Sequence, residues 1–181
     1  MRLSSQRITG RAGVALIVII LLTLSGCAGN SASDSNTLAG VVITYMDKHK
    51  KDLEKELAPE INAGQAQVWM SPDKALQVTM TGQTAFPPGS AMINENFIPT
   101  LKKIASVVNT YGETTIRVIG HPDPGGTVAE RTSMANLRAE VVKNLFLEMG
   151  VSPMVLTASG DPDSNYLDGR VELVIRHSGS I

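Results

Sequence analysis

A basic start followed by a long apolar run separates the first part of this chain from any folded domain. Arg2, Arg7 and Arg11 precede an uncharged stretch, residues 12–24, that is rich in Val, Ile and Leu. A membrane-spanning helix needs about 20 apolar residues, whereas the core of a secretory signal peptide has about 7–15. The pattern therefore predicts a signal peptide over residues 1–26. Residues 27–181 remain to fold, which is enough for one domain and a tail.

The only cysteine, Cys27, follows this run directly, behind the small residues Ser25 and Gly26. Leu-Ser-Gly-Cys resembles the lipobox of bacterial lipoproteins, which implies that Cys27 is acylated and becomes the new N-terminus. Because Ala28 rather than Asp follows, the resemblance also implies an outer-membrane location with the domain facing the periplasm. The alternative is an isolated cysteine that packs as a small hydrophobe. With one cysteine no disulfide forms within the chain, so stability depends on the core.

Charge and composition exclude several classes of function. The net charge is −1, and no block of Lys and Arg follows the signal segment, so nucleic acid is not an expected partner. The three histidines, His49, His121 and His177, are too scattered to form a metal set. No phosphate-binding or dinucleotide-binding loop is present, and we expect neither a cofactor nor an enzyme activity.

Two segments precede the predicted domain at residues 65–181. Residues 27–36 are small and polar and predict a flexible tether behind the acylated cysteine. Residues 37–64 predict an amphipathic helix and a linker, with Asn36 or Thr37 as the helix cap. Its apolar stripe favours packing on its own domain or on a partner. Its lysines form a solvated face or, alternatively, contact an anionic surface.

The remaining residues alternate between strand-like and helix-like patterns. Short runs of apolar and β-branched residues predict strands at residues 66–70, 76–80, 115–119, 155–159 and 170–176. Helical spacing predicts helices at residues 94–109 and 128–149, and Gly150 is a residue typical of a helix C-terminus. This order predicts a two-layer α/β (α+β) sandwich with a mixed sheet.

An acidic and a basic residue lie at neighbouring positions of this predicted fold. Asp123 follows the strand that ends at Gly120, and Arg138 lies within the next helix. The two side chains can share one side of a shallow cleft and bind a zwitterion, the carboxylate taking an ammonium and the guanidinium a carboxylate. The alternative is a surface salt bridge, which contributes little stability.

Residues 76–175 resemble the OmpA-like peptidoglycan-binding domain, which Pal-type lipoproteins and flagellar stator proteins share. The matching motifs, in family order, are Phe86-Pro87-Pro88-Gly89-Ser90-Ala91, Ile119-Gly120-His121-Pro122-Asp123, Arg138-Ala139 with Val141 and Leu145, Gly150-Val151 and Arg170-Val171-Glu172. The resemblance implies a β-α-β-α-β-β mixed sheet with helices on one face, preceded here by an extra N-terminal helix.

The resemblance also implies a function and a site. Asp123 accepts from the ammonium of meso-diaminopimelate in the peptidoglycan stem, Arg138 binds its carboxylate, and Arg170 is a further candidate. The chain is then an outer-membrane lipoprotein that anchors non-covalently to peptidoglycan. The alternative is a structural subunit of an envelope-spanning secretion or conjugation complex of the type IV kind, with other subunits of that complex as partners and a degenerate peptidoglycan site.

The chain departs from the family at several positions around that site. Pro122 stands in place of the usual Thr, and Arg131 stands where an Asn often approaches the ligand. The usual Asn-Arg-Arg-Val has become Asp168-Gly169-Arg170-Val171, which removes one arginine and adds a negative charge. These changes predict weakened or altered peptidoglycan binding.

Overall fold

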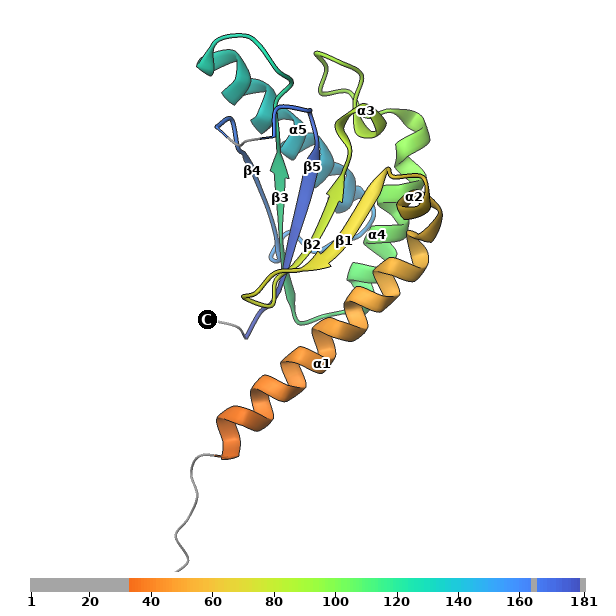
Figure 1. Ribbon diagram of the computed structural model, residues 1–181, viewed down its shortest axis with the longest axis vertical. Helices are drawn as coiled ribbons and strands as arrows, with labels where there is room; N and C mark the ends of the chain where they lie inside the picture. The colour runs from red at the N-terminus through yellow and green to blue at the C-terminus, as the bar shows by residue number, and fades with distance from the viewer. Residues whose placement is uncertain (1–32, 164–165, 180–181) are drawn as a thin grey trace, which may run out of the picture. The chain divides into compact units, whose positions relative to one another are not determined.

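The computed structural model describes residues 33–163 and 166–179. The predicted signal peptide and Cys27 lie outside the described residues. The elements follow one another from N- to C-terminus (Figure 1) as α1 (Ser33–Glu56), α2 (Ala58–Asn62), β1 (Ala66–Met70), β2 (Leu76–Met80), α3 (Gly82–Ala85), the 3₁₀ helix η1 (Glu95–Phe97), α4 (Ile98–Thr110), β3 (Thr114–Gly120), α5 (Val128–Glu148), β4 (Leu156–Gly160) and β5 (Val171–His177).

Five strands form one mixed sheet in the order β1-β2-β5-β3-β4. β1 and β2 form an antiparallel hairpin, and β5 lies antiparallel between β2 and β3. β3 and β4 are parallel, because α5 connects them as a crossover helix. The mixed α+β sheet predicted from the sequence is confirmed.

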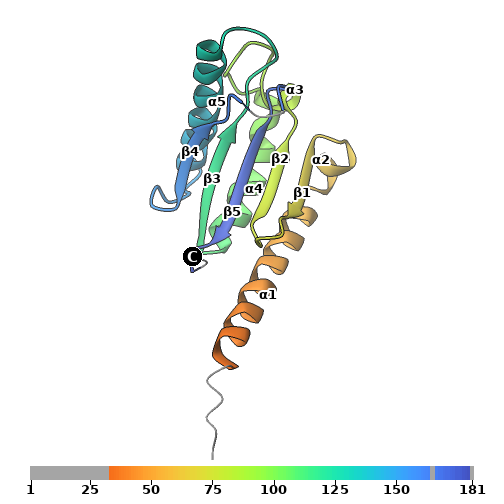
Figure 2. The same ribbon diagram turned by 60° about the vertical axis from the view of Figure 1, so that its left-hand side comes forward.

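The helices α4 and α5 cover one face of the sheet, and both views show them behind it (Figures 1 and 2). The alternation of each strand turns one set of side chains toward these helices. Val78, Leu173 and Val118 are paired across three neighbouring strands, and all three are fully buried. The helices meet this row with buried apolar residues that include Leu101, Ile104, Ala139, Val142 and Phe146.

The two halves of α1 have different surroundings. Met46, His49 and Leu53 are buried in its C-terminal half, where the helix contacts α4 and β1. The N-terminal half extends past the end of the sheet in both views (Figures 1 and 2), and Val41 there is 62% exposed. Among the described helices, none has both the length and the apolar character to cross a bilayer.

The start of α1 differs from the sequence prediction. The helix begins at Ser33, so the predicted cap at Asn36 or Thr37 is wrong and residues 33–36 are helical rather than part of a tether. The preference of Asn and Thr for the cap position is worth only about 1 kcal/mol, so it does not by itself decide where a helix begins.

The other helix boundaries are close to the prediction. The expected helix at residues 94–109 is divided into η1 and α4, and Pro99 lies in the first turn of α4, where its missing N–H costs no hydrogen bond. α5 begins behind Thr127, which forms a capping box with Glu130. Gly150 follows α5 with φ 85°, as expected of a glycine at a helix C-terminus.

Candidate functional site

Asp123 lies in the loop after β3, and contacts from three segments hold it there. The N–H of Gly89, in the loop after α3, donates to Oδ2 of Asp123 at 2.8 Å. On either side of Asp123 the backbone is bound to the segment before β5: the N–H of His121 donates to the carbonyl of Arg170, and the N–H of Gly169 donates to that of Pro122, both at 3.0 Å. The carboxylate is thus fixed in place while its side chain stays 30% exposed.

Arg138 reaches Asp123 because α5 packs very close to the sheet. A Cβ on Gly120 would lie 2.2 Å from the carbonyl oxygen of Ala135, so only glycine allows this approach at the end of β3. Ala135 precedes Arg138 by one helical turn. The close packing therefore places the guanidinium beside the loop that carries Asp123.

The Arg138 guanidinium is buried and fully engaged with the protein. Nη2 donates to Oδ2 of Asp123 at 2.6 Å, Nε to the carbonyl of Ser90 at 3.0 Å and Nη1 to the carbonyl of His121 at 3.0 Å. The Phe86 ring lies under it, with Cζ 5.0 Å from the ring centroid. Only 1% of the residue is exposed. Arg138 thus supports the Asp123 carboxylate and joins the loop after β3 to the loop after α3.

Arg170, the third candidate residue, is engaged with a different carboxylate. Its Nε donates to Oδ1 of Asp168 at 2.9 Å and its Nη2 donates to Oδ2 at 2.6 Å. The guanidinium also stacks on the Tyr166 ring, with Cζ 3.9 Å from the centroid. The hydrogen bonds from Arg170 lower the pKa of Asp168 below its usual value. The structure therefore brings Asp123 and Arg138 together and pairs Arg170 with Asp168.

Gly169 separates these two ion pairs. It has φ 71°, and a Cβ on it would lie 2.7 Å from both Nη1 of Arg138 and Oδ1 of Asp123. A side chain at this position would displace the buried pair. The sequence has glycine here in place of the usual arginine. This glycine allows the loop to pack directly against Arg138.

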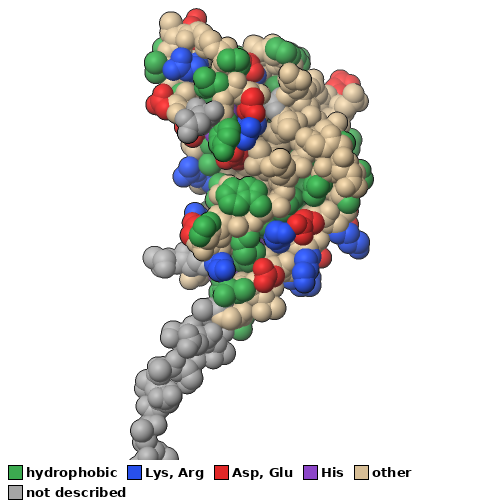
Figure 3. Space-filling model, in the orientation of Figure 1, with side chains coloured by type: hydrophobic (Ala, Val, Ile, Leu, Met, Phe, Trp, Pro, Cys, Tyr) green, Lys and Arg blue, Asp and Glu red, His purple; other side chains and the backbone are tan. Residues whose placement is uncertain are grey.

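The exposed side of Asp123 faces a cleft of about 940 Å³, called here the Asp123 cleft. Its other walls come from the segments after α2, after β2 and before β5, with the lining residues Ala63, Gly64, Gln65, Thr81, Gln83, Thr84, Phe86, Pro88, Gly89, Pro124, Leu167 and Asp168. None of these described lining residues is Lys, Arg or His. Figure 3 shows that the surface over α2 and α3, at the upper right, is mostly uncharged.

Sequence reasoning identified the two charged residues but not their supports. Nothing in the pattern of residues 86–91 indicated that Phe86, Gly89 and Ser90 all contact the Asp123–Arg138 pair. The Phe-Pro-Pro-Gly run was the available signal, since two prolines and a glycine fix the path of a short loop.

Several solved structures share this fold. A MotB-like protein from Desulfovibrio vulgaris superposes with a TM-score of 0.66 at 18% identity, over 77% of this chain and 99% of that one. The periplasmic domain of Helicobacter pylori MotB gives 0.56 at 20% identity, over 62% and 89% of the two chains. The cell wall anchor of the T6SS from Pseudomonas aeruginosa gives 0.56 at 24% identity, over 71% and 99%. At these identities the likeness is one of fold.

One curated protein also matches in sequence. Photosystem I P700 chlorophyll a apoprotein A2 from Gloeobacter violaceus is 25% identical over 141 residues, which are 65% of this chain and 16% of that protein. Because this chain spans about a sixth of that relative and the identity is low, the match assigns no family.

The sequence itself matches the model of the OmpA family over residues 85–171. That range begins in the loop that contacts Arg138 and ends at the first residue of β5, so it includes Asp123, Arg138 and Arg170. The predicted resemblance is confirmed: residues 85–171 of this chain are a domain of the OmpA family.

Proposed function

We propose that this domain binds peptidoglycan through the Asp123 cleft. The observation that carries the proposal is the state of the Asp123 carboxylate, which Arg138 and the Gly89 N–H hold in one orientation at the wall of an open cleft. A carboxylate held by its surroundings binds a cation with little further loss of conformational entropy. Membership of the OmpA family and the fold shared with a cell wall anchor support the same ligand.

The ligand group that suits Asp123 is the ammonium of the diaminopimelate stem. The uncharged amides and hydroxyls of Gln65, Thr81, Gln83 and Thr84 line the opposite wall, where they can bind the amide backbone of a peptide. Arg138 is only 1% exposed and three of its five N–H groups donate to protein acceptors, so in this proposal we assign it a supporting role. It positions Asp123 and does not receive the ligand carboxylate. The interaction is one of binding without catalysis.

The second attachment in this proposal is the lipid on Cys27. The lipobox-like residues before Cys27 and the Ala28 that follows it support an acylated protein of the outer membrane whose domain faces the periplasm. At about 1.5 Å per residue, the 24 residues of α1 span roughly 36 Å. Because its C-terminal half packs on the domain, only the N-terminal half of this helix would act as a stiff spacer between the membrane anchor and the domain that binds the cell wall.

A second candidate function is a structural subunit of an envelope-spanning complex for secretion or conjugation. The observation that favours it is the N-terminal half of α1, where Val41 and Ile43 are exposed beyond the end of the sheet. Exposed apolar side chains on a protruding helix suit a protein partner. Purification from detergent-solubilised membranes distinguishes the two, since a subunit brings other envelope proteins with it and a simple tether does not.

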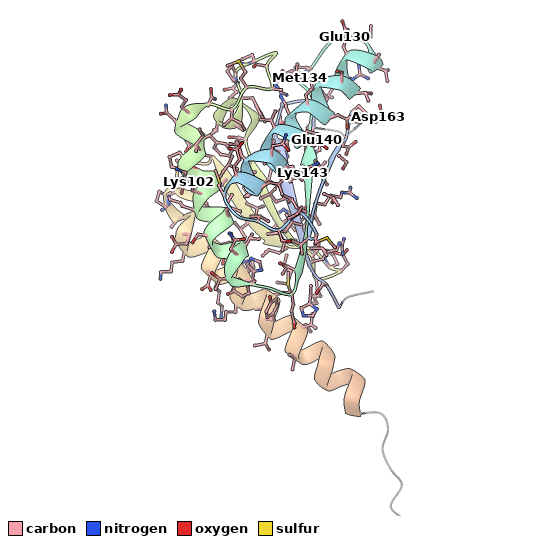
Figure 4. All side chains as sticks on the ribbon, turned by 180° about the vertical axis from the view of Figure 1, so that it is seen from behind. Lys102, Glu130, Met134, Glu140, Lys143 and Asp163 are labelled. Atoms are coloured by element: carbon pink, nitrogen blue, oxygen red, sulfur yellow. The ribbon has the colours of Figure 1, made fainter. Side chains whose placement is uncertain are left out.

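Sedimentation with purified sacculi tests the peptidoglycan proposal. We expect wild type to sediment and Asp123→Asn to remain mostly in the supernatant, because the neutral amide no longer attracts an ammonium. Glu140→Gln is the matched control, since Glu140 lies on the exposed side of α5 and pairs with Lys143 outside the cleft (Figure 4). The proposal fails if Asp123→Asn sediments as wild type does.

Replacement of Cys27 tests the lipid anchor separately. Cys27→Ser removes the thiol that would be acylated, so we expect the protein to leave the membrane fraction and to lose incorporation of labelled palmitate. A Cys27→Ser protein that stays in the membrane fraction would contradict the anchor and leave the cleft assignment untouched.

A further inference from the structure

We propose that Arg131, in the first turn of α5, binds the carboxylate of the ligand whose ammonium is bound by Asp123. This inference rests on the proposed function and names a second binding residue for it.

The other two arginines near Asp123 are less suited to bind a ligand carboxylate, because one is buried and the other is already paired with a carboxylate. Arg138 is buried, and its Nε, Nη1 and Nη2 each donate to a protein acceptor. Arg170 is held by Asp168 through three hydrogen bonds and stacks on Tyr166. A zwitterionic ligand therefore needs another cation beside Asp123.

Arg131 provides a cation in a second hollow that shares Gly89, Asp123 and Pro124 with the Asp123 cleft. Arg131 and Asp123 line this hollow of about 140 Å³, called here the Arg131 hollow, whose other walls are Gly89, Pro122, Pro124, Gly125, Glu130 and Met134. Figure 4 shows Glu130 and Met134 at the N-terminal end of α5. A space of this size holds about four or five waters, or the carboxylate and ammonium on one carbon of an amino acid.

The hydrogen bonds of Arg131 leave donors free for a ligand. Nη1 donates to the carbonyl of Gly126 at 3.1 Å, which orients the guanidinium, whereas Nε is buried with no acceptor. Within the described part of the chain Arg131 makes no ion pair. A carboxylate that bound the exposed end of the guanidinium would supply the missing charge.

The Glu130 carboxylate, which also lines the Arg131 hollow, is already engaged. It accepts from the N–H of Thr127 at 2.7 Å and from the Thr127 hydroxyl at 2.9 Å, as part of the capping box. These hydrogen bonds lower the pKa of Glu130, so it stays ionised and remains bound to the cap.

The place of Arg131 in its helix is unfavourable for stability. The N-terminus of a helix carries a partial positive charge, so a cation in the first turn is repelled by it. The same partial charge attracts an anion that comes to Arg131. Arg131 therefore does not stabilise α5, and binding of a carboxylate accounts for its presence at this position.

A cycle of two proteins and two ligands tests the assignment. Calorimetry would measure full-length wild type and Arg131→Gln with two stem peptides, one with free-acid diaminopimelate and one whose side-chain carboxylate is a carboxamide. We expect wild type to bind the free acid at least about tenfold more tightly, since the amide removes the charged partner of Arg131. Arg131→Gln should bind the two stems alike, because residue and carboxylate act as one coupled pair.

Arg117→Gln is the charge-matched control and should keep the wild-type preference. Arg117 lies on β3, exposed, and lines neither the Asp123 cleft nor the Arg131 hollow. The thermal midpoint of Arg117→Gln should equal that of wild type, and that of Arg131→Gln should be the same or slightly higher, because the substitution removes a cation from the first turn of α5.

The outcomes separate this inference from the proposed function. If Arg131→Gln keeps the preference for the free acid, or if wild type has none, the role of Arg131 is overturned while peptidoglycan binding stands. The same holds if wild type sediments with sacculi but binds neither stem. If Asp123→Asn binds both stems as wild type does, the proposed function itself is overturned.

Discussion

Two aspartate–arginine pairs lie on either side of Gly169, and their environments differ. In each pair an Nη2 nitrogen is 2.6 Å from a carboxylate oxygen. The Arg138 side chain is 1% exposed, whereas that of Arg170 is 23% exposed and its partner Asp168 is 45% exposed. The N–O distances are therefore the same in the two pairs, and the pairs differ in how deeply the arginine is buried.

This difference assigns different roles to the two pairs. A buried guanidinium must be satisfied at every nitrogen, so Arg138 binds two carbonyls as well as Asp123 and fixes the loops that carry them. An exposed pair is screened by water and contributes little stability. Asp123–Arg138 is thus part of the framework of the site, and Asp168–Arg170 is a replaceable feature of its rim.

The largest expected effect is the difference in stability between variants that lack one arginine or the other. Arg138→Ala leaves the Asp123 carboxylate and the Ser90 and His121 carbonyls without their donor, and we expect a loss of about 4 kcal/mol in the free energy of unfolding. Arg170→Ala should lose less than about 1 kcal/mol. Urea denaturation of both variants measures the difference. Equal losses would mean that burial does not distinguish the pairs.

His49 is another buried polar side chain, but unlike Arg138 it has no hydrogen-bond partner among the described residues. His49 stacks on Tyr111, with ring centroids 4.0 Å apart, and neither ring nitrogen has a hydrogen-bond partner. Burial lowers the pKa of His49 to about 4. Between that value and the usual pKa of about 6.5, the unfolded chain binds a proton that the folded protein does not. Stability from this residue is therefore complete above about pH 6.5 and falls as the pH decreases toward 4.

Replacement of His49 by Phe should remove this dependence while keeping the stacked ring. We expect His49→Phe to be more stable than wild type, with a difference that grows by about 3 kcal/mol between pH 7 and pH 4. Thermal unfolding across this range provides the measurement. Parallel pH profiles for the two proteins would refute the assignment.

Substitution of Gly169 tests how closely the loop covers the buried pair. Gly169→Ala puts a methyl group against Arg138 and Asp123 in a left-handed backbone, and we expect a loss of about 2 kcal/mol or more. Gly125→Ala is the matched control, because Gly125 has φ 96° with nothing within 4 Å of the added Cβ. The control should lose about 1 kcal/mol from backbone strain alone. Equal losses would show that the loop has room for a side chain.

The smallest expected effect concerns the exposed pair. Asp168→Asn removes the ion pair with Arg170, and we expect a loss below about 1 kcal/mol at neutral pH. Because Arg170 lowers the pKa of Asp168, this contribution is present above about pH 4 and disappears as the pH falls further. A loss of several kcal/mol, or one that persists at pH 2, would place Asp168 in the framework instead.

The sequence was sufficient to predict the strands and the proximity of the two charged residues. The β-branched run that ends at Gly120 and the helical spacing around Arg138 each specify a local structure, and a crossover helix brings them together. The burial of Arg138 was not predictable in this way. It depends on Gly169, Phe86 and Ser90, which are distant in sequence and contact the arginine only after the loops are packed.

The N-terminal helix shows a second limit of sequence reasoning. Asn36 and Thr37 are good caps, yet the helix begins at Ser33, because local capping preference is worth only about 1 kcal/mol. The stacking of His49 on Tyr111 likewise joins α1 to the end of α4, and no spacing within either helix indicates it.

Mapping of the bound ligand by NMR tests the central claim most directly. A free-acid diaminopimelate stem would be titrated into ¹⁵N-labelled protein. Binding at Asp123 predicts shifts in the amide signals of Gly89, Gly125 and Gly126, while Thr115 and Arg117 on the open face of the sheet stay unchanged. Shifts confined to the open sheet face or to α1, with Gly89 and Gly125 unaffected, would contradict the assignment of the site.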